Sequence, residues 1–191
     1  MKVSVNNPIN RGRWALLLLG VAVAAMAADA AYSQPHRNPQ TLIETVRHAT
    51  ARFRDVNIAL AEGWVPATPC VSGPDAGAMG VHFAQPARQA DGTVPPDAPQ
   101  FLIYEPMADG SMRLVGVEFF VLVTDWENKN GAGPAVLDGN LMNLIPFPNR
   151  YGLPAFYEMH VWAWEDNPKG TFADWNTRVN CDREVVPPAG S

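Results

Sequence analysis

The fold is decided by the stretch Met112-Arg-Leu-Val-Gly-Val-Glu-Phe-Phe-Val-Leu-Val-Thr124. Most of its residues are β-branched or aromatic, which favours an extended strand. Because alternate side chains of a strand point to opposite faces, Glu118 shares a face with Gly116 and Phe120. A lone buried carboxylate is costly unless it is paired, so Glu118 predicts a polar partner, with open space left beside it by Gly116.

Three further strand-like runs accompany this one, at residues 79–84, 101–105 and 156–164. Residues 107–111 (Met-Ala-Asp-Gly-Ser) have the composition of a hairpin turn, and so short a connection favours an antiparallel meander. Residues 125–154 are rich in glycine and proline and are expected to cover a sheet edge or the mouth of a pocket.

The segment before Cys70 has a helical rather than a strand period. Thr41 and Glu44 form a capping-box pattern, and Gly63 is a natural stop. Apolar residues recur between them at steps of three and four, at Leu42, Val46, Ala49, Phe53, Val56 and Leu60. The fold class predicted is therefore α+β, with one long N-terminal amphipathic helix of about twenty residues packed on a curved antiparallel sheet.

Residues 1–30 have the layout of a secretory signal peptide. A basic start precedes the apolar run 14–28, and small residues allow cleavage after Ala27 or Ala30. The run is short for a membrane anchor, which needs about 20 apolar residues, although an uncleaved N-terminal anchor is the alternative. We expect a periplasmic or secreted protein with one α+β domain at residues 31–184 and a flexible tail at residues 185–191.

The net charge of the chain argues against some classes of partner. The chain has a formal net charge of −5, and removing residues 1–30 takes away three basic residues and one acidic residue, which leaves −7. An acidic domain without a basic run argues against a nucleic acid partner, and against a membrane partner after signal cleavage. A small ligand or a metal ion is the expected partner, and the oligomeric state stays open.

Cys70 and Cys181 are the only two cysteines of the chain. An even count in an oxidising compartment predicts one disulfide between them. The alternative is Cys70 as a nucleophile beside a histidine, as in thiol hydrolases.

Two histidines lie inside apolar, strand-like runs, where a titratable side chain is unexpected unless it has a structural or functional role. His82 ends the stretch Gly77-Ala-Met-Gly-Val-His82, and His160 lies in residues 156–164. If both strands expose them on one face, they converge with Glu118 and Glu105 on one pocket. Imidazoles and carboxylates together suit Zn, Cu, Fe or Mn.

The spacing itself gives this ligand set no support, because the ligands are scattered and only the fold brings them together. The alternative is a pair of structural histidines bonded to carboxylates or backbone. Neighbouring side chains are expected to line the ligand pocket, although core packing also accounts for them: Met79, Tyr104, Trp162 and Trp164.

Several enzyme classes are excluded, since the chain has no G-x-S-x-G, P-loop, Rossmann glycine pattern or cupin-type H-x-H. The function predicted is an exported, non-catalytic protein that holds a divalent metal or small ligand in a His/Glu pocket. The alternatives are a metal-dependent enzyme using the same residues and a structural or partner-binding domain. The sequence assigns no catalytic residue.

Four blocks carry a resemblance to other proteins: GAMGVHF (77–83), LIYEP (102–106), LVGVE (114–118) and HVWAWEDNPKGTFADWN (160–176). Together they resemble a group of uncharacterised exported bacterial proteins, over about residues 41–181. The resemblance implies an exported bacterial protein and leaves its activity open.

Overall fold

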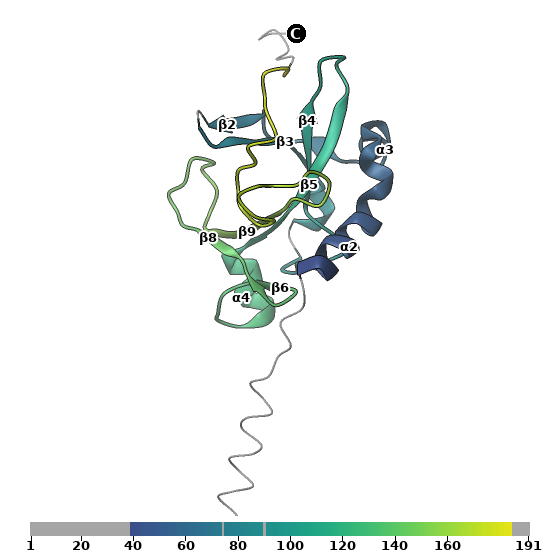
Figure 1. Cartoon of the computed structure of the whole chain (residues 1–191). Coiled ribbons are helices and arrows are strands. Elements are labelled where there is room, and N and C mark those ends of the chain that lie inside the picture. The colour runs from purple at the N-terminus through teal and green to yellow at the C-terminus, as the bar shows by residue number, and fades with distance from the viewer. Residues whose placement is uncertain (1–38, 74, 90, 185–191) are drawn as a thin grey trace, which may run out of the picture. The chain divides into compact units, whose positions relative to one another are not determined.

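Antiparallel pairing around one long strand builds the main sheet (Figure 1). The computed structural model describes residues 39–73, 75–89 and 91–184, all within one compact unit. The strand order is β1-β3-β4-β5-β9-β8, and β2 pairs with β3 outside this path. The strands are β1 (Val65–Pro66), β2 (Val71–Gly73), β3 (Gly77–Ala84), β4 (Phe101–Pro106), β5 (Met112–Leu122), β8 (Asn143–Ile145) and β9 (Phe156–Val161).

The α+β class and the antiparallel meander β3-β4-β5 are confirmed. Residues 125–154 contain more structure than predicted: most of α4 (Val123–Asn130), the hairpin of β6 (Val136–Leu137) and β7 (Asn140–Leu141), and β8. Because α4 begins at Val123, β5 ends two residues earlier than expected. β8 pairs with β9 and so covers that edge of the sheet.

The prediction of one long helix is wrong. The chain forms α2 (Pro39–Thr50), the 3₁₀ turn η1 (Ala51–Arg54) and α3 (Val56–Ala61), and a second 3₁₀ turn, η2, spans Pro86–Arg88. Asp55 causes the break, because its backbone is extended and its carboxylate accepts the Asn57 N–H at 2.9 Å as the cap of α3. The capping box is wrong too, since α2 begins at Pro39 and Thr41 lies inside it.

One face of the sheet, called here the helix face, packs against these helices (Figure 1). Tyr104 donates its hydroxyl to the Phe53 carbonyl at 2.7 Å, and the Trp164 indole donates to Thr50 at 3.0 Å. The buried strand residues of this face include Val81, Phe83, Leu102, Tyr104, Leu114, Val117, Phe119, Val121, Tyr157, Met159 and Val161, and they belong to one core with Leu42, Val46, Phe53 and Ala59.

Cys70 and Cys181 lie together as predicted, joined as a disulfide with their Cα atoms 5.6 Å apart. No free thiol remains among the described residues, so the alternative of Cys70 as a nucleophile is not supported. The pairing ties the segment before β2 to the last described residues of the chain.

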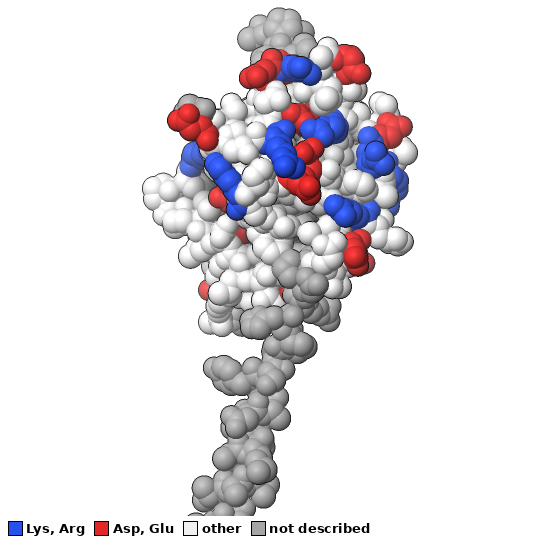
Figure 2. Space-filling model, in the orientation of Figure 1, with Lys and Arg blue, Asp and Glu red and all other residues white. Residues whose placement is uncertain are grey.

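The predicted signal peptide, both of its cleavage points and the tail at residues 185–191 lie outside the described residues. Within the part of the chain that is described, no helix has the length and apolarity to cross a bilayer. On the face drawn in Figure 2, Lys and Arg side chains lie close to Asp and Glu side chains.

Candidate metal site

The opposite face of the same strands gathers polar groups. We call it the site face, and it carries His82, Ala84, Phe101, Ile103, Glu118, Phe120, Glu158 and His160. Glu118 of β5 lies directly opposite His160 of β9. His82 comes from β3, which β4 separates from β5, and its ring reaches across β4 toward them.

Three ligand atoms converge at the centre of this face. The Nε2 atom of His82 lies 3.3 Å from Nε2 of His160 and 3.3 Å from Oε2 of Glu118. All three ligand atoms lie within 4.8 Å of one another, and the three residues are only 1–7 % exposed. The structure thus brings together three of the four side chains predicted to bind a metal.

Neighbouring side chains orient the rings of the two histidines. The Thr68 hydroxyl lies 3.2 Å from Nδ1 of His82 and also accepts the backbone N–H of His82. A proton on Nδ1, donated to Thr68, leaves the Nε2 lone pair free to face the other two ligand atoms. The His160 ring stacks on Trp162, with ring planes 20° apart, and its Nδ1 lies 3.9 Å from Oδ1 of Asp174.

Burial controls protonation in this cluster. It lowers the pKa of His82 to about 4, and with the charges of His82 and Arg150 it holds the pKa of His160 well below its usual value. Burial and the neighbouring Glu158 raise the pKa of Glu118 well above its usual value. Burial, then the charge of Asp174, raises the pKa of Glu158 to about 7. At neutral pH both imidazoles are therefore neutral, which is the form that binds metals.

A cavity of about 340 Å³ adjoins the three ligand atoms. Four aromatic side chains form part of its wall, with Phe120 in contact with both Phe101 and Phe156, and with Tyr151 against Phe156. Tyr151 is 38 % exposed, so the cavity meets solvent along the segment between β8 and β9. Residues 125–154 were predicted to cover a sheet edge or a pocket mouth, and within them β8 forms an edge while Tyr151 and Leu153 line the cavity.

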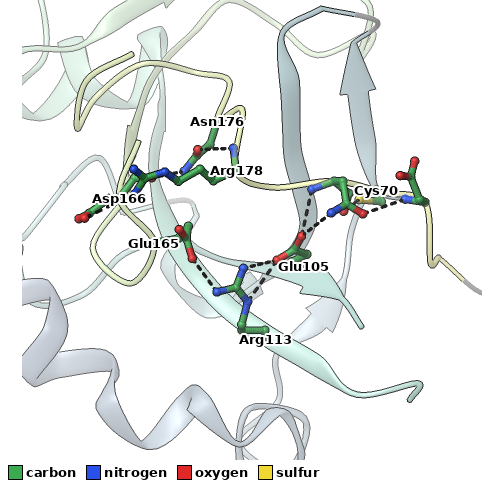
Figure 3. Close-up of polar contacts among 9 residues, drawn as sticks. Cys70, Glu105, Arg113, Glu165, Asp166, Asn176 and Arg178 are labelled. Carbon is green, nitrogen blue, oxygen red and sulfur yellow. Dashed lines mark hydrogen bonds and ion pairs between the residues drawn. The ribbon is translucent and has the colours of Figure 1, made fainter. Parts of the chain in front are cut away.

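Glu105 does not join the other predicted ligands, although it is buried. Its carboxylate accepts hydrogen bonds from the Arg113 guanidinium and from the backbone and side chain of Asn180 (Figure 3). Arg113 lies opposite Glu105 in the strand register and also pairs with Glu165. A register irregularity between Ile103 and Tyr104 separates this network from the site, so Glu105 is a structural ion-pair partner.

The four residues expected to line the pocket divide between the two faces, and none lines the cavity. Tyr104 belongs to the helix face, and so does Trp164, because β9 ends at Val161 and the alternation stops there. Trp162 stacks against the ring of His160. Met79 contacts the Arg150 guanidinium at 3.5 Å.

The open space expected beside Glu118 is filled. A Cβ atom on Gly116 would lie 2.9 Å from the Val161 carbonyl and 3.3 Å from the Trp162 ring. Gly116 therefore allows β9 and Trp162 to approach closely, and the cavity lies on the other side of Glu118, toward Phe101 and Phe120.

Several residues of the site were not predicted from the sequence. Glu158 shares the strand face of His160, so alternation offered a signal for it. Thr68, Arg150 and Asp174 lie in irregular segments, where no periodicity predicts which way a side chain points.

Comparisons of the chain with protein-family models, curated proteins and solved structures give no match.

Proposed function

We propose that the protein binds a divalent transition metal ion through His82, Glu118 and His160. The observation that carries the proposal is the pair of 3.3 Å distances from Nε2 of His82 to the other two ligand atoms. Two atoms that bind one tetrahedral ion at about 2.1 Å each lie roughly 3.4 Å apart. Both distances from Nε2 of His82 therefore suit a shared ion.

A hydrogen bond alone accounts for this geometry less well. Nε2 of a neutral imidazole has either one proton or one lone pair, so it makes one strong hydrogen bond. Here a single Nε2 faces two partners at the same distance. Two histidines and one carboxylate are a common ligand set for zinc and for non-haem iron, and Cu or Mn also accept these donors.

We place this site in an exported protein. Disulfides persist in oxidising compartments, so the Cys70–Cys181 pair supports export, as does the pattern of residues 1–30. Binding of the ion releases the proton that the raised pKa keeps on Glu118, so the affinity for metal should fall as the pH falls.

The test is metal uptake by tag-free protein stripped with a chelator and dialysed against Zn²⁺, followed by elemental analysis. The variant is the double substitution His82→Ala/His160→Ala, and His48→Ala is the matched control because His48 is exposed on α2. We expect zinc in the wild type and in the control but not in the folded double variant. A wild type that takes up no Zn, Cu, Fe or Mn contradicts the proposal.

The cavity favours a second candidate, a metal-dependent enzyme. A metal with an open position beside a 340 Å³ apolar cavity can polarise a bound molecule or activate water. Hydrolysis of model esters and phosphoesters by the zinc form, and oxygen consumption by the iron form, test this candidate. Turnover that is lost in Glu118→Gln supports an enzyme, and absence of turnover in every loaded form supports a non-catalytic binding protein.

A further inference from the structure

His160 has a second ring nitrogen that the proposed site does not use. Its Nδ1 is fully buried and has no hydrogen-bond partner among the residues that the structure describes. Buried polar atoms in folded proteins nearly always have a partner, so an unpartnered one requires an explanation. Because Nε2 of the same ring faces His82, a 180° rotation about Cβ–Cγ would put the carbon Cε1 in the place of Nε2 and lose that contact.

Two carboxyl groups lie close to this ring. Glu158 lies two residues before His160 on the same strand face, and Asp174 comes from the segment after β9. That segment is held in place by the Trp162 indole, which donates to the Ala173 carbonyl at 2.6 Å. One oxygen of each carboxyl group and one ring nitrogen of His160 lie within 4.8 Å of one another, and Nδ1 is the nitrogen that lies 3.9 Å from Asp174.

A simple hydrogen bond between the ring and Asp174 is not formed. The distance from Nδ1 to Oδ1 is 3.9 Å, which is too long, and Oδ1 instead accepts a hydrogen bond from Asn143 at 3.3 Å. One carboxylate would be enough to orient a metal-bound histidine, yet two converge here. A buried and a partly exposed carboxyl group beside an unpartnered ring nitrogen are better explained by a shared cation.

We propose that Glu158, Nδ1 of His160 and Asp174 bind a second divalent transition metal ion. The inference rests on the proposed function, because His160 then contacts one ion through each nitrogen and bridges them. The bridging ring gives up its N–H proton to solvent, and the carboxylates of Glu158 and Asp174 balance the charge of the second ion. Imidazole and carboxylate donors suit the same metals as in the first site.

The test is equilibrium dialysis of tag-free protein against Zn²⁺, with the bound metal counted per chain in matched variants. Asp174→Asn removes a ligand of the second site, at a side chain 36 % exposed that tolerates the change. Asp166→Asn is the control, because its side chain is 86 % exposed and lies outside both sites. His82→Ala removes a ligand of the first site alone.

We expect about two ions per chain in the wild type and the control, and about one in Asp174→Asn. One ion in the wild type that is lost in His82→Ala but kept in Asp174→Asn overturns the second site and leaves the first standing. One ion with the opposite pattern upholds the second site and overturns the first. No bound ion overturns both.

Loading with Cu²⁺ adds a second measurement, the magnetic coupling between two bound ions. No such coupling is expected if Asp174 only orients the ring of His160. Two Cu²⁺ ions joined by one imidazolate couple magnetically, so the doubly loaded protein should give a weaker electron paramagnetic resonance signal than its copper content requires. Asp174→Asn should restore a full signal from the remaining ion. A full, uncoupled signal from two bound ions contradicts the bridge.

Discussion

The helix face and the site face are made by alternate residues of the same strands, yet they differ in chemistry. Phe119 points into a core that α2, η1 and α3 close, whereas Glu118, its neighbour in the chain, points toward two histidines and a cavity. On the helix face helical side chains fill the space. On the site face irregular segments carrying Thr68 and Tyr151 cover the sheet and leave a cavity.

Adjacent residues of one strand can therefore serve different purposes, one in the stability of the core and the next in the candidate site. The helix face gains free energy by burying apolar surface. The site face keeps three carboxyl groups and two neutral imidazoles close together, which is costly without a cation to share. Substitutions on the two faces should therefore have different consequences, and four experiments test that difference.

The largest expected effect is on the helix face. Phe119→Ala leaves a cavity in the core and should lower the free energy of unfolding by about 3–5 kcal/mol. Urea denaturation measures this loss. Metal binding by the folded variant should stay at the wild-type level, and a loss of binding there would mean that the two faces are coupled.

The matching substitution on the site face is Glu118→Gln, one residue away. Outer partners of metal ligands alone account for about 10- to 100-fold in affinity, so loss of the ligand itself should weaken Zn²⁺ binding by more than about 100-fold. Competition with a chromophoric chelator measures this change. The metal-free stability should fall much less than in Phe119→Ala, and a comparable fall would contradict the assignment of the two faces.

The third effect concerns pH and the metal-free protein. Burial raises the pKa of Glu158 from 4.5 to about 7, so the native state keeps a proton that the unfolded state has released. This stabilisation is present below pH 4.5 and is lost as the pH rises through about 7. Glu158→Gln does not titrate there, so the wild type should lose on the order of 1–3 kcal/mol relative to the variant.

Urea unfolding in the presence of a chelator, at about pH 5 and about pH 8, measures that difference. The same stability gap between wild type and Glu158→Gln at both pH values would show that the carboxyl group is not perturbed by the site face.

The smallest effect is expected at Thr68. Thr68→Val keeps the shape of the side chain but removes the hydroxyl that contacts Nδ1 of His82. The ring is then less well oriented, and Zn²⁺ affinity should fall by about 10-fold. Calorimetric titration measures the change, with Thr45→Val as the control because its hydroxyl only bonds within α2. Unchanged affinity would mean that Thr68 does not position the ring.

How well the sequence predicts the structure also differs between parts of the molecule. The four longest strands, β3, β4, β5 and β9, were predicted to within three residues of their observed ends because runs of β-branched and aromatic residues recur with a period of two, whereas the strands of two or three residues were not predicted. The helix break was missed because the apolar stripe continues across Asp55, although Asp at that position was a cap signal. The alternation of side chains along each strand placed Glu118 and His160 on definite faces. Only the pairing register of β5 and β9 shows that the two residues lie opposite each other.

The predicted site residues that do not join the cluster lie where the strand alternation ends. Glu105 follows a register irregularity and has its own partner in Arg113, and Trp164 lies beyond the last residue of β9. Asp174 and Thr68 belong to segments whose direction depends on tertiary contacts such as the bond from Trp162 to Ala173. No local pattern in the sequence contains that information.

The most direct test of the central claim is the position of the metal itself. Crystals of the zinc-loaded protein, measured on both sides of the zinc absorption edge, locate the ion by anomalous scattering. We predict a peak within about 2.0–2.2 Å of Nε2 of His82, Nε2 of His160 and a carboxylate oxygen of Glu118. Zinc bound only at surface positions, with Nε2 of His82 and Nε2 of His160 still 3.3 Å apart and no ion between them, would contradict this proposal.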